Sequence, residues 1–316
     1  MLKAFDYVDR ISDRASIQSA ERYQRELKLA RAAVDRAFQP EGESVGLCPG
    51  CHGDVASFFF RKWEVPYFYC PKCGSVFTTI DDETLKEYQN DEALCAFRSS
   101  EESQREAEEK RSQNWSELMD WFSFRSYRYL GLNRGLRVVS GNERYRGLTA
   151  LLESSELCGS FEVLKEGSET RGDIALSLNM VQQTNDPDRH LREMNRHLEN
   201  KGLLFLSARI GTGFDILVLR EHAQVYPYEY VSLLSRKGLE LALERTGFRM
   251  LDYSTPGSMD VGYVRARYAF IPEEELFIRN LIRDSDERTL QEFQRFLQKG
   301  GMSSYAHIVA QKVEEA

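Results

Sequence analysis

The sequence feature that most limits how this chain can fold is a set of two Cys-x-x-Cys pairs. Cys48 and Cys51 form the first pair and Cys70 and Cys73 the second, with 18 residues between the pairs. Both pairs enclose proline, and glycine lies in or next to each of them, as tight turns require. Two such pairs can present four thiolates tetrahedrally to one metal ion. We therefore expect a compact zinc-ribbon module over residues 43–80.

Zn²⁺ is the ion that a four-Cys set favours, and such a site leaves no open coordination position. The metal would then hold the fold and take no part in catalysis. A rubredoxin-like iron site remains an alternative, and a redox-active pair is disfavoured because there are two pairs. His52 is surplus to a complete ligand set and is expected at the surface. Cys95 and Cys158 are expected to be small buried apolar residues.

Composition and charge disfavour several classes of protein. The chain has 316 residues, of which 41% are hydrophobic, and a net charge of −8. An acidic chain is an unfavourable nucleic-acid binder unless a local patch, here Arg61, Lys62 and Lys72, is basic. No apolar run reaches the ~20 residues of a membrane span. The N-terminus lacks the apolar core of a signal peptide, so we expect a cytoplasmic protein.

From about residue 131, strand-like and helix-like segments alternate. Strands are expected at 136–140, 160–166, 173–181, 203–210 and 249–255, and a final strand at 304–312. Helices are expected at 142–155, at 186–202 with a C-cap at Gly202, at 235–248 with a stop at Gly247, and twice within 272–301. This alternation predicts an α/β fold with a doubly wound, mostly parallel sheet.

The expected organisation has five parts. An N-terminal helix lies within residues 1–42, and the zinc ribbon follows at 43–80. A helical connector occupies 81–130 and leads into a Rossmann-like domain at 131–270. Residues 271–316 supply C-terminal helices and the final strand.

Three long segments carry a family resemblance. They are DIALSLNMVQQTNDPDRHLREMNRHLENKGLLFLSARIGTGFDILVL, GLELALERTGFRMLDYSTPGSMDVGYV and EFQRFLQKGGMSSYAHIVAQK. From about residue 45 onward the chain resembles bacterial class I S-adenosylmethionine-dependent methyltransferases that carry an N-terminal zinc ribbon. Relatives often act in sugar-modification or polysaccharide pathways. The resemblance implies a Rossmann-like methyltransferase fold and a site for S-adenosylmethionine.

The expected cofactor positions depart from the family pattern. In the family, the first strand ends in an acidic residue and a glycine-rich turn, which lets the backbone approach the cofactor. Here Val139 takes the acidic position and Gly141 is kept, while Glu143 and Tyr145 replace the other two glycines. Glu143 would oppose the carboxylate of the cofactor. The second strand offers Glu166 for the ribose hydroxyls.

The expected catalytic positions differ as well. The Glu-His pair of the family reads Gln182-Gln183, and glutamine cannot act as a base. The family's loop histidine is Tyr230, and its final Ser-Ser-His ends in Tyr305. His222, in the loop before Tyr230, is a further catalytic candidate.

Other polar residues have two possible roles. Arg209 could meet an anionic ligand or pair with a carboxylate. Asp215 and Asp260 lie in matched motifs and could simply cap or turn the chain. His190 and His197 share one helix face and are expected to face solvent.

Two functional hypotheses follow. The first is a methyltransferase-like protein whose S-adenosylmethionine site is degenerate. It would be a non-catalytic binding or assembly subunit, beside a protein partner or an active paralogue. The second is an active methyltransferase with a variant cofactor loop, acting on a sugar nucleotide or related small molecule. In that case Glu166 would hold the ribose and Tyr230 would orient the acceptor.

Overall fold

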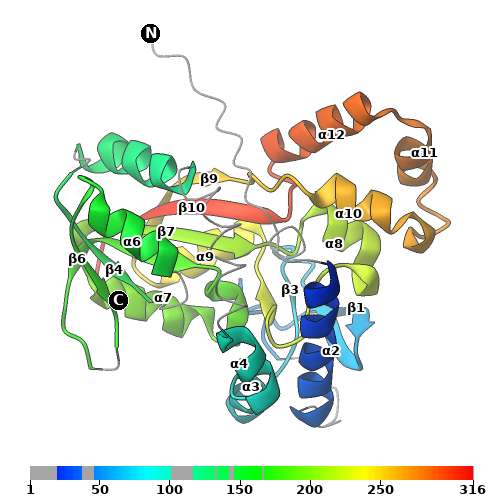
Figure 1. Ribbon diagram of the computed structural model, residues 1–316, viewed down its shortest axis with the longest axis horizontal. Coiled ribbons are helices and arrows are strands. Elements are labelled where there is room, and N and C mark those ends of the chain that lie inside the picture. Colours follow the sequence, from blue (N-terminus) through cyan, green and yellow to red (C-terminus); the bar gives the residue numbers. More distant parts are fainter. Residues whose placement is uncertain are drawn as a thin grey trace.

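The computed structural model describes residues 20–37, 46–100, 117–131, 134–141, 146–165 and 167–315. It contains a six-stranded sheet in the order β5-β4-β6-β7-β10-β9 and a four-stranded sheet in the order β1-β2-β3-β8. Figure 1 shows the large sheet with helices on both faces and the small sheet beside one end of it. The architecture is α/β, as the sequence predicts.

The large sheet is mostly parallel. Its strands are β4 (Leu136–Ser140), β5 (Cys158–Val163), β6 (Gly172–Leu178), β7 (Leu198–Arg209), β9 (Phe248–Ser254) and β10 (Tyr305–Lys312). Strands β5, β4, β6 and β7 run parallel, and β10 is antiparallel to both β7 and β9. The expected doubly wound, Rossmann-like sheet is therefore confirmed, and the final strand of the chain lies inside it.

Helices bury both faces of this sheet. The helix at 117–130 and α6 (Arg146–Ser154) contribute to one apolar core, which includes Trp121 and Phe205. On the opposite face, α7 (Pro187–Arg196) and α9 (Arg236–Arg245) form the second core with the other side of β7. The starts of α7 and α9 are capped by Asp186 and Ser235, whose side chains accept backbone N–H groups.

One helix boundary was predicted wrongly. The helix expected over 186–202 ends at Arg196, and β7 begins at Leu198 and passes through Gly202. The buried ammonium group of Lys312, on β10, donates to the carbonyls of Asn195 and Leu198, both at 2.9 Å. Because a distant strand supplies these donors, the helix ends earlier than the local pattern indicates. Gly202 is therefore not a helix C-cap.

The expected stop at Gly247 is confirmed. Helix α9 ends at Arg245, and Gly247 has a φ of +76°. A Cβ at this position would lie 2.6 Å from the carbonyl oxygen of Glu314. Both the left-handed backbone and the close approach require glycine.

The small sheet joins distant parts of the chain. Its strands are β1 (Ser57–Lys62), β2 (Val65–Tyr69), β3 (Val76–Phe77) and β8 (Ser232–Leu233), and all pairs are antiparallel. Strand β8 comes from the long segment that follows β7, so the small sheet is completed by the chain of the α/β region. The helices α2 (Ala20–Ala37), α3 (Asp82–Gln89) and α4 (Glu92–Ser99) pack over this junction.

The remaining helices lie beyond the carboxyl end of β7. They are α8 (Phe214–Leu219), α10 (Asp260–Ala266), α11 (Leu276–Asp284) and α12 (Glu287–Lys299). Figure 1 shows them grouped at one end of the large sheet. Within the described part of the chain, no helix has the length and apolar character of a membrane span.

Candidate functional site

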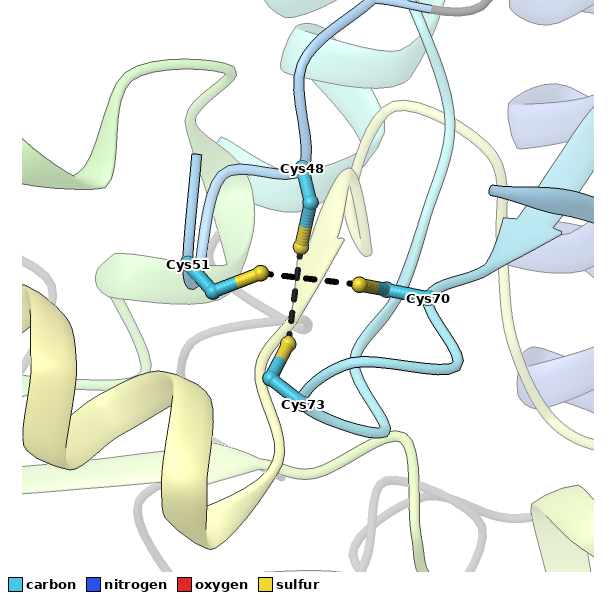
Figure 2. Close-up of side chains that lie close together, drawn as sticks. All are labelled: Cys48, Cys51, Cys70 and Cys73. Carbon is cyan, nitrogen blue, oxygen red and sulfur yellow. Dashed lines mark hydrogen bonds between the residues drawn. The ribbon is translucent and has the colours of Figure 1, made fainter. Parts of the chain in front are cut away.

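The four predicted metal ligands converge on one point. Figure 2 shows the side chains of Cys48, Cys51, Cys70 and Cys73 directed toward a common centre. Their sulfur atoms all lie within 4.8 Å of one another. The Cys48–Cys73 and Cys51–Cys70 separations are 3.5 and 3.6 Å. A tetrahedron with metal–sulfur distances of ~2.3 Å has edges of about 3.8 Å, so the cluster fits one such ion.

The two cysteine turns have the same backbone geometry. The N–H of His52 donates to the carbonyl of Cys48 at 2.8 Å, and that of Gly74 donates to the carbonyl of Cys70 at 2.7 Å. His52 and Gly74 both have positive φ angles, +54° and +82°. Each turn thus brings its two sulfur atoms to one side, and the two turns face each other. This repeated geometry explains why two Cys-x-x-Cys pairs predict a single metal site with four sulfur ligands.

Thiol protonation in the cluster is shared between neighbours. The hydrogen bond with Cys48 lowers the pKa of Cys73 to about 4, and the same contact raises the pKa of Cys48. Metal ligation requires thiolates, so a bound cation would displace the protons from these sulfur atoms. Three of the four residues are buried, and Cys51 is half-buried. Such a closed cluster suits a structural ion.

Helix α9 holds the second cysteine turn in place. The hydroxyl of Ser235, the N-cap of α9, donates to the carbonyl of Cys73 and accepts the N–H of Gly238 at 2.9 Å. The N–H of Ser235 donates to the hydroxyl of Ser75 at 3.1 Å. A Cβ on Gly238 would lie 2.3 Å from that hydroxyl. The metal module is therefore packed directly on the start of a helix of the α/β region.

A charged group holds the first cysteine turn. Arg245, at the end of α9, donates to the carbonyls of Gly50 and Pro49 at 2.8 and 3.3 Å. It also forms two hydrogen bonds of 2.9 Å with the buried carboxylate of Asp188. His52 lies 3.5 Å from the same carboxylate, and half of its side chain is exposed, at the surface as the sequence indicates.

The two remaining cysteines do not both follow the prediction. Cys95 is exposed, and its thiol donates to the carbonyl of Gln89. Cys158 is half-buried at the start of β5, and its thiol donates to the carbonyl of Ser160. The prediction of a buried Cys95 was wrong because one face of the short helix α4 is exposed to solvent.

Gly141 follows β4 at the carboxyl end of the parallel strands, where this type of fold binds nucleotides. A Cβ on Gly141 would lie 3.2 Å from the side chains of both Met180 and Met194. Val139, at the expected acidic position, is buried in the apolar core on the α7 side. Glu143, Tyr145 and Glu166 lie outside the described residues.

A backbone hydrogen bond joins Gln182 to the segment that carries Tyr230, and Tyr230 lies beside Arg209. The carbonyl of Gln182 accepts the N–H of Val231 at 2.7 Å, and its amide donates to Asn179 at 3.5 Å. The side-chain oxygen of Gln182 is buried and has no hydrogen-bond partner among the described residues. The guanidinium of Arg209 lies 5.6 Å from the ring centre of Tyr230, which is buried.

His222, the other catalytic candidate, lies in η2 (Arg220–His222). Its imidazole stacks on Phe270 with ring centres 4.1 Å apart, and more than a third of its side chain is exposed. The carbonyls on either side, of Glu221 and Ala223, accept hydrogen bonds from Lys62 at 2.6 and 2.8 Å. Burial lowers the pKa of Lys62 to about 8. The two catalytic candidates thus have different ring neighbours, Phe270 for His222 and Tyr226 for Tyr230.

A buried charged cluster explains several matched motif positions. Arg209 pairs with Asp215, and the hydroxyl of Ser304 contacts the carboxylates of both Asp215 and Asp260. Asp260 also accepts the N–H of Ser304 at 2.7 Å and the hydroxyl of Ser303 at 2.6 Å. These contacts tie β7, α8, α10 and β10 together. Of the two roles that sequence left open, Arg209 takes the ion pair.

The two histidines of α7 are not simply solvent-facing, contrary to expectation. His197 is buried, and its ring nitrogens contact the carbonyl of Thr170 at 2.8 Å and Glu193 at 3.0 Å. His190 contacts the hydroxyl of Ser177 at 2.7 Å, and desolvation lowers its pKa to about 4. Their arginine neighbours suggested exposure, but α7 lies against the sheet on this face.

The sheet itself carries a feature that sequence reasoning missed. In the usual doubly wound order 3-2-1-4-5-6, a third strand lies beyond the second. Here β5, the second strand of the domain, is at the edge, and the chain passes from β5 directly to β6. The connection spans residues 164–171, of which only 166 is outside the described residues, and the described ones form neither helix nor strand. The expected strands at 160–166 and 173–181 are too close for a helix and a further strand to lie between them, so the sequence could have indicated this direct connection.

The comparisons give similarity to solved structures alone. No family model matches the chain, and no curated protein matches it. A putative sarcosine dimethylglycine methyltransferase from Galdieria sulphuraria is 12% identical over 66% of this chain and 88% of its own, with a TM-score of 0.41. A mycolic acid cyclopropane synthase complexed with SAH and CTAB is 13% identical over 64% and 85%, with a TM-score of 0.38.

A third solved structure has a comparable identity and TM-score. The plantazolicin methyltransferase, in complex with a triazolic analogue and SAH, is 14% identical over 70% of this chain and 94% of its own, with a TM-score of 0.38. At these identities the similarity concerns the arrangement of the chain and not its activity.

Proposed function

We propose that this chain is a methyltransferase-like protein with a degenerate S-adenosylmethionine site, and that it serves as a non-catalytic binding or assembly subunit. The observation that carries the proposal is the direct connection from β5 to β6. A nucleotide-binding half of a doubly wound fold has three strands with two crossover helices. This chain has two strands and α6, so part of the frame around an adenosine group is missing.

The residues at the carboxyl end of β4 support the same conclusion. The position expected to be acidic is the buried Val139, and Met180 and Met194 crowd the kept glycine, Gly141. By sequence, Glu143 adds a negative charge where the cofactor would place its carboxylate. Each unmatched polar group of a bound cofactor costs about 1–3 kcal/mol. Two or three such losses would turn a micromolar site into a millimolar one.

The second support is the chemistry of Gln182 and Tyr230. Neither is a base near neutral pH, because a glutamine amide does not titrate and an unperturbed tyrosine has a pKa of ~10. Arg209, which lies beside Tyr230, is already paired with Asp215. Neither of the residues at these two family positions can therefore take a proton from an acceptor.

We propose Zn²⁺ as the ion of the cysteine cluster. The four sulfur ligands, their near-tetrahedral separations and their burial suit a structural zinc site. The ion would fix the two cysteine turns against α9 and supply no chemistry to a reaction. Elemental analysis of protein purified without added metal should give about one zinc per chain. Iron in its place would favour the rubredoxin-like alternative.

Calorimetric titration with S-adenosylmethionine and S-adenosylhomocysteine tests the main proposal. We expect no heat of binding at micromolar concentrations of either. The matched variant Glu143→Gly with Tyr145→Gly restores the glycines of the loop. It should remain a non-binder, because the connection from β5 to β6 is unchanged. Micromolar binding by the natural chain would refute the proposal and favour an active methyltransferase that acts on a sugar nucleotide or related small molecule.

A further inference from the structure

The outer edge of β5 is an unpaired sheet edge. Strand β5 pairs with β4 on one side, and no strand of the described chain pairs with its other side. Gly159, Ser160 and Glu162 are exposed. Exposed edges present backbone N–H and C=O groups that can accept another strand.

The hydrogen bonds to β4 identify which backbone groups point outward. The N–H of Leu164 donates to the carbonyl of Ser140 at 2.8 Å, and Ser140 is paired with Val163. In a parallel ladder, alternate residues of a strand bond to the same neighbour. Residues 160, 162 and 164 therefore bond inward to β4. The N–H and C=O groups of Phe161 and Val163 point outward. The C=O of Gly159 does so too, because it shares a peptide unit with the inward N–H of Ser160.

From Ser160 onward this edge lacks the usual protection against pairing. Edge strands are commonly protected by lysine, proline, a bulge or an unneutralised charge. The six residues of β5 include no lysine or proline. The pairing with β4 is irregular at Gly159, between the Leu136–Cys158 and Arg137–Ser160 pairs, and is regular from Ser160 to Val163. The single charge, Glu162, already accepts hydrogen bonds from the hydroxyls of Ser168 and Thr170 at 2.8 to 3.0 Å. The charge is thus held on the sheet face and does not guard the edge.

We propose that two copies of this chain associate through antiparallel pairing of their β5 strands about a two-fold axis at Phe161. A two-fold axis perpendicular to the sheet keeps each side chain on its own face, so residues that face each other across the axis must have side chains on the same face. Because side chains alternate along a strand, the numbers of two such residues differ by an even number. With the axis at Phe161, Gly159 of one copy faces Val163 of the other. The two Phe161 residues then exchange both of their backbone hydrogen bonds, and the N–H of each Val163 donates to the carbonyl of Gly159 in the other copy.

The side chains of β5 are compatible with this register on both faces. On the α6 side, Phe161 meets its own symmetry mate, and Val163 packs over the glycine of the partner. On the α7 side, Glu162 of one copy faces Ser160 of the other. No like charges are opposed, and apolar or small residues meet one another. The second copy is favoured as the occupant because this one register satisfies both the backbone and the side chains.

A pair of charge variants at one exposed position tests the register. Ser160→Lys places two cations opposite the two Glu162 side chains, whereas Ser160→Glu places like charges there. Cross-strand pairs of this kind change affinity by roughly two- to thirtyfold in total. We expect the dimer dissociation constant to fall for Ser160→Lys and to rise for Ser160→Glu. Residue 160 also faces Arg137 of β4 within each copy, in the monomer and the dimer alike. The interaction of either variant with Arg137 therefore does not change the dimer dissociation constant.

Sedimentation velocity of the full chain over a concentration series measures the association. Hydrogen exchange then locates it, because the amides of Phe161 and Val163 should be protected in concentrated samples and exchange in dilute ones. A monomer at the highest usable concentration would overturn the proposal. A dimer that responds to neither Ser160 variant would overturn it too, since the interface would lie elsewhere. These outcomes do not depend on whether S-adenosylmethionine binds.

Discussion

Removing the hydroxyl of Ser235 should weaken the metal module and the α/β region together. Ser235 is buried, and its hydroxyl caps α9 through the N–H of Gly238 while donating to the carbonyl of Cys73. Loss of the cap costs about 1 kcal/mol. The buried Cys73 carbonyl also loses its donor, at about 1–3 kcal/mol. We therefore expect Ser235→Ala to lower the free energy of unfolding by about 2–4 kcal/mol.

The same substitution should reduce zinc affinity. The Ser235 hydroxyl holds the backbone of a cysteine whose sulfur is a proposed metal ligand, and groups that orient ligands commonly contribute 10- to 100-fold to affinity. Urea unfolding of the metal-loaded protein measures the stability. Competition with a chromophoric chelator measures the affinity.

A second helix cap in the same chain is the control. Asp286 caps α12 by accepting the N–H of Thr289 at 2.8 Å, and it is exposed. Asp286→Ala should remove one exposed helix cap and leave zinc affinity unchanged. If Ser235→Ala cost no more than this control, or did not change zinc affinity, the contact between α9 and the cysteine turn would not have the role assigned to it.

Three further outcomes test the packing. Between pH 7 and 5 the natural chain should lose about 2 kcal/mol more stability than the His190→Asn variant. The pKa of His190 is about 4 in the folded chain and 6.5 in the unfolded chain, so the unfolded chain is protonated first as the pH falls. Urea unfolding at the two pH values measures the difference. Asp260→Ala should cost about 3 kcal/mol or more in urea unfolding, because it leaves buried donors without an acceptor; a loss below 1 kcal/mol would contradict this. Gly213→Ala should lower the melting temperature sharply, because its Cβ would lie 2.3 Å from the backbone of Ser304, whereas Gly262→Ala, with open space around it, should be neutral or stabilising.

The sequence predicted correctly the features that depend on interactions between residues close together in the chain. The two cysteine pairs indicated the metal module because each turn closes within a few residues, through the hydrogen bonds from His52 and Gly74. The alternation of segments indicated the parallel sheet, and the glycine at 247 marked the end of α9 correctly. Asp215 and Asp260 lie in motifs that the sequence also identified, although their partners were not predictable.

Contacts between distant segments account for what the sequence did not show. The helix α7 ends early because Lys312, more than a hundred residues away, donates to the carbonyl of Asn195 in its last turn and to that of Leu198 just beyond it. His190 and His197 look exposed in a run of arginines, yet the sheet and the loop at Thr170 enclose them. Gln182 and Tyr230 are adjacent because β8 continues the small sheet beside the carboxyl end of β6.

The sequence alone determined the elements: four cysteines spaced for one ion, strands that alternate with helices, and a cofactor turn that keeps one glycine. Tertiary structure decided how these elements complete one another. It placed β10 between β7 and β9, joined the metal module to α9, and left β5 at an edge. The physical reason is that turns and helices are stabilised within a few residues. Sheet order and buried ion pairs depend on chain segments that meet only when the whole domain has folded.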